Sequence, residues 1–263
     1  MNELRTIKEK LLVGQPVIGS MIVQVRTPAI VQLFAEYGLD FIVIDMEHGP
    51  YNVETVADLI QTARLAGIAP LVRVGEVHYH LYSLALDMGA QGIISPRIEN
   101  VEQVRSINRF MHYPPAGERG FSRLAAHVNF AEIDSREYVQ WANEYLLNII
   151  QIESKQAVED LEILLSEPGI DGVLVGIDDL ALSFNLPGET SHEKVEEALQ
   201  LIFETCIRKG VFWGLHSPDA NRLAGWMERG MNFILYSSDI WMLQQALKKD
   251  LKLLRSERPM IPG

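Results

Sequence analysis

Cysteine is almost absent from this chain of 263 residues, which contains only Cys206. A disulfide framework or a metal site built from several cysteines needs more thiols than this, so neither is expected. No hydrophobic run reaches the roughly 20 residues that cross a bilayer, and the first twelve residues are charged and amphipathic rather than typical of a secretion signal. These absences predict a cytoplasmic protein.

Positive charge is also scarce. The chain has 23 Lys and Arg residues against 35 Asp and Glu residues, for a formal net charge of -12. This balance argues against nucleic acid or an anionic membrane as a general partner, and an anionic small substrate would need local positive charge. Hydrophobic residues make up 48% and charged residues 22%, which is ordinary for a globular protein. We expect residues 1–263 to form a single domain.

Short apolar segments alternate with amphipathic segments along the whole chain. A helix is expected at residues 3–12, and strands, each followed by a helical pattern, are expected at 17–25, 41–44, 71–74, 92–95, 148–152, 172–176, 211–216 and 232–237. Eight such pairs predict the α/β class and a closed (β/α)₈ TIM barrel. An open doubly wound sheet is disfavoured because no Gly-x-Gly-x-x-Gly loop follows any strand. The longest expected loop, 113–134, interrupts the alternation.

Carboxylates follow two consecutive strands of this pattern. Glu153 comes after 148–152, and Asp178 and Asp179 come after 172–176. Parallel strands end on the same side of a sheet, where neighbouring carboxylates repel unless a cation or a proton lies between them. Oxygen ligands suit Mg²⁺ or Mn²⁺. The alternative is structural, since Asp178 or Asp179 could cap the next helix, and the residues alone leave both readings open.

Other strand ends carry further candidates. Asp45 lies three residues before His48 and could orient its ring, as the partner of a general base does; the alternative is a loop histidine with a local hydrogen bond. Arg73 interrupts an apolar strand and could either pair with Asp45 or Glu47 or bind a substrate carboxylate and oxo group. His216 also ends a strand, but no acid closely precedes it, so it ranks below His48.

Several motifs, in this order, resemble those of the HpcH/HpaI aldolases. They span about Gly19 to about Leu243 and read FIVIDMEHGP, PLVRV, LDMGAQGIISPRIEN, YPPAGERG, IIQIES and GIDGVLVGIDDL. Members of this family are metal-dependent class II aldolases with a TIM barrel of the phosphoenolpyruvate/pyruvate type. The resemblance implies the same fold here, with an N-terminal helix.

The resemblance also implies a role for each candidate residue. It places a divalent cation (Mg²⁺, Mn²⁺ or Co²⁺) on Glu153 and Asp179, pyruvyl oxygens on Arg73, a base at His48 paired with Asp45, Gln151 beside the metal, and Asp87 near the site of a neighbouring subunit. Backbone N–H groups at Asp178 and Asp179 could also bind the substrate carboxylate.

The implied reaction is the reversible cleavage of a 4-hydroxy-2-oxo acid to pyruvate and an aldehyde through a metal-stabilised enolate. The alternatives are a citrate-lyase-like or malyl-CoA-like lyase, an oxaloacetate decarboxylase, and a binding barrel without catalysis. A class I aldolase would need a Schiff-base lysine, for which only Lys155 is near a strand end. The resemblance further implies a homo-oligomer, typically a hexamer, in which the last helix packs on a neighbour or on its own barrel.

The chain departs from the family pattern at three places near the expected mouth of the barrel. Arg97 follows the fourth-strand proline, where an apolar residue is usual; Gly-Ile-Asp precedes Asp179, where Gly-Pro-Ala is usual; and Ser20 and Met21 replace Leu-Trp. Arg97 could bind a distal carboxylate of the substrate or form a salt bridge with Glu99 or another acid. These differences leave undetermined which aldehyde the enzyme uses.

Overall fold

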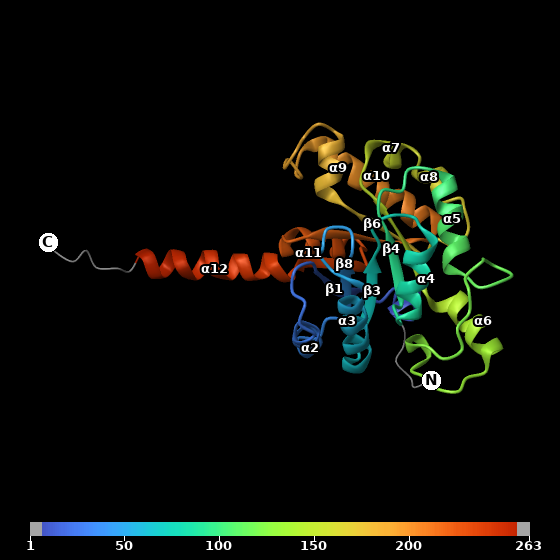
Figure 1. The fold of residues 1–263 in the computed structure, drawn as a ribbon. Coiled ribbons are helices and arrows are strands. Elements are labelled where there is room, and N and C mark those ends of the chain that lie inside the picture. The colour runs from blue at the N-terminus through green and yellow to red at the C-terminus, as the bar shows by residue number, and fades with distance from the viewer. Residues whose placement is uncertain (1–6, 257–263) are drawn as a thin grey trace.

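The computed structural model describes residues 7–256 and contains a closed barrel of eight parallel strands (Figure 1). The strands pair in chain order and β8 closes on β1. They are β1 (Val17–Ile22), β2 (Phe41–Asp45), β3 (Ala69–Arg73), β4 (Gly92–Ser95), β5 (Leu147–Ile152), β6 (Gly172–Val175), β7 (Phe212–Ser217) and β8 (Phe233–Ser238). The predicted (β/α)₈ barrel is confirmed.

Helices follow the strands, as the alternating pattern predicted, and most of them cover the outside of the barrel. The helix predicted between the fifth and sixth strands is split in two, and the predicted first helix is described only from residue 7. The helices are α1 (Ile7–Leu12), α2 (Ala29–Glu36), α3 (Val53–Ala66), α4 (Tyr79–Asp87), α5 (Val101–Met111), α6 (Ser135–Tyr145), α7 (Lys155–Glu159), α8 (Leu161–Leu164), α9 (Ile177–Ser183), α10 (Glu193–Lys209), α11 (Ala220–Glu228) and α12 (Asp239–Ser256), with a 3₁₀ turn at Ala126–Val128.

The N-terminal helix α1 closes the bottom of the barrel. Its two buried apolar residues belong to the hydrophobic cluster that fills the barrel interior. Its lysines bind acids that directly precede strands: Lys8 lies 2.8 Å from Asp171 and Lys10 lies 2.6 Å from Asp40. Because this end is closed, an open site is expected at the carboxyl ends of the strands, as in other barrels of this class.

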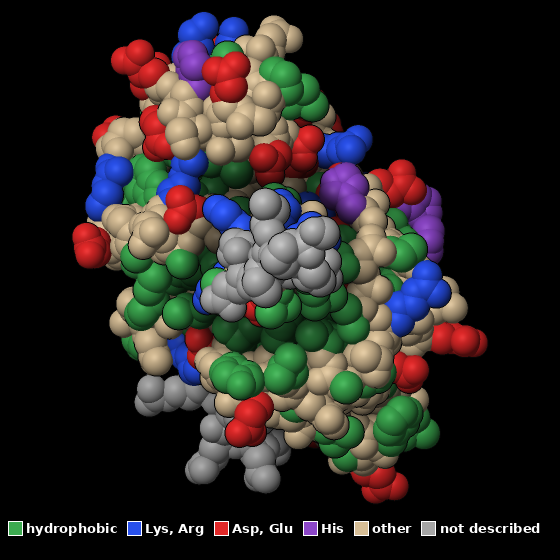
Figure 2. All heavy atoms as spheres, turned by 90° about the vertical axis from the view of Figure 1, so that its left-hand side faces the viewer, with side chains coloured by type: hydrophobic (Ala, Val, Ile, Leu, Met, Phe, Trp, Pro, Cys, Tyr) green, Lys and Arg blue, Asp and Glu red, His purple; other side chains and the backbone are tan. Residues whose placement is uncertain are grey.

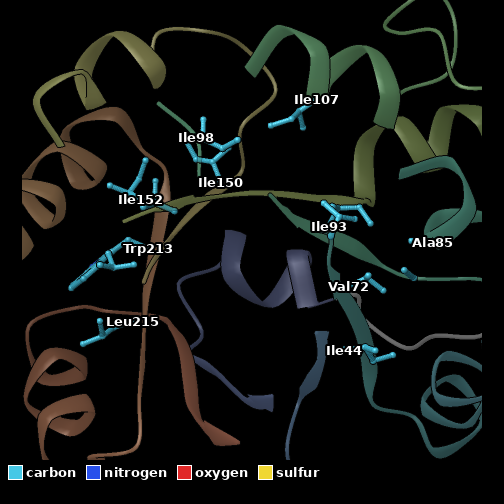
Figure 3. Packing of buried hydrophobic residues seen from close by; sticks show 14 of the residues in the cluster. Ile44, Val72, Ala85, Ile93, Ile98, Ile107, Ile150, Ile152, Trp213 and Leu215 are labelled. Carbon is cyan, nitrogen blue, oxygen red and sulfur yellow. The ribbon is translucent and has the colours of Figure 1, made fainter. Parts of the chain in front are cut away.

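A larger hydrophobic cluster fills the space between the barrel and its helices. Outward-facing strand residues such as Ile44 and Val72 belong to it together with helix residues such as Ala85 and Ile107 (Figure 3). Strand residues therefore alternate between this outer cluster and the interior one, as the two-residue period of a strand requires. That alternation fixes which side chain at each strand end faces the barrel axis.

The inward-facing layer nearest the carboxyl ends is polar. Val43, Leu71 and Ile149 belong to the interior cluster, and the next inward positions along β2, β3 and β5 lie two residues further. Continued along the strands, this spacing brings to one layer Asp45, Arg73, Gln151 and His216. The barrel thus changes from an apolar core to a polar mouth within one step of the strand period.

Cys206 is fully buried in α10, and burial raises the pKa of its thiol to about 12, as expected for a structural residue. Among residues 7–256, no helix combines the length and the apolar character needed to span a bilayer.

Gly214 in β7 has no room for a side chain. An added Cβ would lie 2.0 Å from the backbone oxygen of Phe233 in β8, which is fixed by the sheet. We expect Gly214→Ala to lower the free energy of unfolding by about 1–3 kcal/mol, the usual range for overpacking, as measured by urea denaturation. Gly225→Ala in α11 is the matched control, because an added Cβ there meets nothing within 4 Å and alanine favours the helix. Equal stability of the two variants would contradict this account.

Candidate active site

A buried ion pair joins the ends of β2 and β3. Arg73 donates from Nε and Nη2 to the two carboxylate oxygens of Asp45, each at 2.8 Å. Asp45 Oδ1 also accepts from the backbone N–H groups of Glu47 at 3.0 Å and His48 at 3.4 Å, so this carboxylate shapes the turn after β2. Burial acts to lower the pKa of Arg73, but the hydrogen bonds and charge of Asp45 raise it above its ordinary value. Arg73 therefore stays charged.

The third nitrogen of this guanidinium faces the next strand ends. Arg73 Nη1 lies 3.5 Å from Glu47 Oε2 and 3.5 Å from Gln151 Oε1, and Gln151 Nε2 donates to Glu153 Oε2. Both ion pairs that the sequence offered for Arg73, with Asp45 and with Glu47, are present. Polar contacts thus run without interruption from β2 through β3 to the end of β5.

Glu153 is held from the other side by the backbone of Arg97. Its Oε1 accepts from the N–H of Arg97 at 2.7 Å, and Arg97 has φ 55, which is uncommon for a residue with a side chain. The Arg97 side chain is exposed and its Nε lies 3.1 Å from Glu47 Oε1. Of the two readings left open for Arg97, a salt bridge with an acid is present, and the acid is Glu47 rather than Glu99.

The hydrogen bonds to the carboxylates at this end of the barrel do not fully offset burial and the repulsion between their negative charges. Burial, together with the charges of Glu47 and Asp179, raises the pKa of Glu153 against the hydrogen bonds from Gln151 and Arg97. Glu47 Oε2 is buried without a hydrogen-bond partner. An added Cβ at Gly176 would lie 2.6 Å from Glu153 Oε2, so glycine keeps the space beside that oxygen open.

This donor set fits a divalent cation that also takes ligands from outside the protein. The oxygens are hard ligands, and their mutual repulsion is relieved by a positive ion. In the part of the chain that the structure describes, no group of three or more His, Cys, Asp or Glu side chains is placed to enclose a metal. A cation here would therefore need further ligands from water and substrate, as Mg²⁺ sites commonly have.

Asp178 and Asp179 lie in the first turn of α9 and are exposed. The residue that caps this helix is Gly176, and no side-chain capping bond is made. The structural alternative, in which one of these acids is the helix cap, is therefore wrong. Carboxylates in a first helical turn are favoured by the helix dipole, and these two remain available at the mouth.

His48 follows β2 with its imidazole about half exposed, and its Nε2 lies 4.0 Å from Glu47 Oε2. Asp45 holds the backbone of His48 rather than its ring, because the oxygens of Asp45 already accept from Arg73 and from two backbone N–H groups. The carboxylate nearest the ring is therefore Glu47, whose place in the site was not anticipated beyond its pairing with Arg73.

Asp87 lies outside this group. It ends α4, and helices of such a barrel run back toward the amino ends of the strands, away from the mouth. Its carboxylate binds Arg119 Nη2 at 2.6 Å, and His127 Nδ1 lies 3.9 Å away. Burial and the charge of Arg119 lower the pKa of His127. The structure does not bring Asp87 to the site of its own chain, and its role toward a neighbour stays a prediction.

His216 belongs to the mouth, although it ranked below His48 in the sequence. It lies in the same inward layer as Asp45, Arg73 and Gln151, and its Nε2 is 3.1 Å from the carbonyl oxygen of Ser237. The signal that could have raised its rank is strand spacing, because it stands two inward steps beyond Phe212 on the same strand.

Known proteins are similar to this chain in sequence and in fold. The sequence model of the HpcH/HpaI aldolase/citrate lyase family matches residues 20–246. The chain belongs to this family. It is 31% identical over 257 residues to a 2-keto-3-deoxy-L-rhamnonate aldolase of Salmonella gallinarum, covering 95% of this chain and 92% of the relative.

Solved structures of the family agree with the barrel. An HpcH/HpaI aldolase from Desulfitobacterium hafniense superposes with a TM-score of 0.94 at 34% identity, covering 98% of this chain and 99% of the other. The citrate synthase SbnG superposes with a TM-score of 0.87 at 29% identity, covering 97% and 99%. The predicted family and the predicted enzyme class, an aldolase within a family of carbon–carbon lyases, are confirmed.

The raised pKa of Glu153 gives a pH dependence of stability in the metal-free protein. Its neutral form favours the fold, so this contribution is complete below the unfolded pKa of about 4.5 and is lost as pH rises through the raised folded pKa. Glu153→Gln cannot ionise. We expect its Tm in chelator, relative to the parent protein, to rise as the pH is increased above about 4.5.

The control for this measurement is Glu162→Gln. Lys209 and Arg208 lower the pKa of the exposed Glu162, so its contribution to stability is present above the unfolded pKa and lost as pH falls. Its relative Tm should change little and in the opposite direction, since surface pairs contribute little. Parallel pH curves for the parent protein and Glu153→Gln would contradict the placement of Glu153.

Proposed function

We propose that this chain, acting as one barrel domain, cleaves a 4-hydroxy-2-oxo acid to pyruvate and an aldehyde with the help of a divalent cation, and catalyses the reverse addition. The observation that carries the proposal is the meeting of the buried carboxylate of Glu153 with Glu47, Asp179 and the charged Arg73 at the mouth. The kinship with 2-keto-3-deoxy-L-rhamnonate aldolases supports the same class of substrate.

Glu153 and Asp179 would hold Mg²⁺, Mn²⁺ or Co²⁺. Bound there, the cation supplies Lewis-acid stabilisation of negative charge on the substrate oxygens. Gln151 donates to one oxygen of Glu153 and the backbone of Arg97 donates to the other, so the carboxylate is oriented before any ligand binds. Such supporting hydrogen bonds fix ligand geometry and tune affinity. Backbone N–H groups at Asp178 and Asp179 would bind the substrate carboxylate.

Arg73 binds the pyruvyl part of the substrate. Asp45 fixes two of its nitrogens, so the planar guanidinium is held still and Nη1, which makes only long contacts of 3.5 Å to Glu47 and Gln151, has N–H groups to offer a ligand. A fixed cation beside the carboxylate and 2-oxo oxygens stabilises the charge that grows there as the C3–C4 bond breaks. The role of Asp45 is therefore to position Arg73.

His48 takes the proton from the 4-hydroxyl when the C3–C4 bond breaks. Its ring is open to a ligand on one side and lies 4.0 Å from Glu47 Oε2 on the other. In the addition direction the same ring returns the proton to the new hydroxyl oxygen.

We also propose that the chain forms a homo-oligomer, and a hexamer by family resemblance. Figure 1 shows α12 leaving the barrel as a single helix. One of its faces is an exposed apolar stripe at helical spacing, made of Ile240, Leu243, Leu247, Leu251 and Leu254. An isolated amphipathic helix is only marginally stable in water, so this stripe needs a surface to cover it.

The barrel of the same chain also has exposed hydrophobic side chains that nothing in the chain covers. Ile18 on the outer face of β1 is 38% exposed, and Leu33 and Tyr37 at α2 are exposed as well. Figure 2 shows hydrophobic side chains gathered on the face from which α12 projects. The stripe of one chain laid on this face of another would cover both surfaces.

The metal requirement predicts a chelator-sensitive release of pyruvate. We expect cleavage of a racemic 4-hydroxy-2-oxo acid to stop with chelator and to return with Mg²⁺, Mn²⁺ or Co²⁺. Glu153→Ala and Asp179→Ala should each lower kcat/KM at least about a hundredfold, whereas Glu159→Ala, at an exposed acid of α7, should not. Undiminished turnover by both site variants would overturn the proposed metal site.

The apolar stripe of α12 predicts a change of assembly rather than of fold. Leu247→Glu combined with Leu251→Glu should reduce the mass measured by light scattering, because buried unpaired carboxylates are costly. Lys249→Glu, on the opposite side of the helix, is the control and should leave the mass unchanged. A parent protein that is monomeric at micromolar concentration would refute the proposed assembly.

A further inference from the structure

His216 is the inward-facing polar side chain that β7 contributes to the mouth. Phe212, at the start of the strand, packs against the interior cluster, and His216 lies two inward steps further along. His216 pairs in register with Leu235 of β8, which belongs to the same cluster. The imidazole therefore faces the barrel axis, in the layer that holds Arg73.

One nitrogen of the ring is engaged and the other is free. His216 Nε2 lies 3.1 Å from the carbonyl oxygen of Ser237; a carbonyl can only accept, so Nε2 carries the proton. The neutral ring then has a lone pair on Nδ1. Among residues 7–256 no group forms a hydrogen bond with this Nδ1. The atom is also absent from the set of fully buried polar atoms without a partner, so it is accessible from outside the protein. It therefore opens onto the mouth.

The surroundings favour the neutral ring. Burial lowers the pKa of His216, and the charge of Arg73 lowers it further, against the hydrogen bond to Ser237 and the charges of Asp178 and Asp45. A neutral His216 with its proton on Nε2 presents an acceptor to the mouth and no donor.

We propose that Nδ1 of His216 accepts a hydrogen bond from a hydroxyl of the substrate and makes the enzyme selective for hydroxylated aldehydes. The inference rests on the proposed aldol reaction. The carboxylate and oxo group of a 2-oxo acid can only accept hydrogen bonds, and Arg73 supplies donors to them. The hydroxyls are the only donors such a substrate has. Because the 4-hydroxyl gives its proton to His48, the hydroxyl that His216 receives lies beyond C4, on the part derived from the aldehyde.

The test compares two aldehydes of equal size, glycolaldehyde and propionaldehyde, which differ by a hydroxyl in place of a methyl group. Each is added to pyruvate by the Mg²⁺-supplemented enzyme, and the ratio of the two kcat/KM values is taken as the preference. The intrinsic reactivities of the aldehydes cancel when this ratio is compared between variants. Loss of one hydrogen bond should lower the preference about tenfold in His216→Leu. His192→Leu, at the partly buried histidine that caps the start of α10, is the control.

Two further variants separate a substrate contact from a structural one. Asparagine can place an acceptor near the position of Nδ1 but is too short to reach the Ser237 carbonyl. Glutamine can donate to that carbonyl, as Nε2 does, but leaves the Nδ1 position empty. We expect His216→Asn to keep most of the preference and His216→Gln to lose it. This comparison also decides the matter if His216→Leu fails to fold.

Each other outcome counts against the inference in a distinct way. If His216→Gln keeps the preference and His216→Asn loses it, the ring acts only by holding Ser237. If all variants show the parent's ratio, His216 does not contact the hydroxyl, while the aldol reaction itself stands. If the parent enzyme joins pyruvate to neither aldehyde with any of the three cations, the proposed function fails and the role of His216 fails with it.

Discussion

The paired hydrogen bonds between Arg73 and Asp45 govern the rest of the mouth. A buried arginine needs a buried acid, and the fork satisfies both groups with two bonds of 2.8 Å. Arg97 adds a second, exposed cation beside Glu47, but no arginine or lysine forms an ion pair with Glu153 among the described residues. The mouth is therefore rigid, because its cation is fixed, and still short of positive charge. Rigidity together with unbalanced carboxylates is what a site for a divalent cation requires.

The apolar barrel beneath the mouth offsets the energetic cost of gathering these polar and charged groups. Inward positions of the strands are apolar up to the last layer, and α1 closes the opposite end with two lysine–aspartate pairs. Buried apolar area thus stabilises the closed part, while the polar groups are gathered where water and ligands can reach them. The space around these groups is tight at Gly176, where a single added carbon would lie 2.6 Å from the oxygen of Glu153.

Much of this mouth could be predicted because parallel strands end together, so residues far apart in sequence, such as Arg73 and Glu153, were expected to meet. What remained hidden depends on contacts that no spacing reveals. Asp45 was expected to hold the His48 ring, but Arg73 takes its oxygens. His216 ranked low for want of a nearby acid, yet its partner is the backbone carbonyl of Ser237, on the following strand.

The exposed helix α12 is coupled to the mouth through its first residue. Asp239 is buried, and its carboxylate accepts from the backbone N–H groups of Val23 at 3.1 Å, Gln24 at 3.0 Å and Val25 at 2.7 Å. These three residues follow β1 at the carboxyl end of the barrel, so the start of α12 and the loop after β1 are held by one side chain. A neighbour that covered the apolar stripe of α12, as proposed above, would also restrain this loop. In the proposed oligomer this buried carboxylate would therefore link assembly to the shape of the active site.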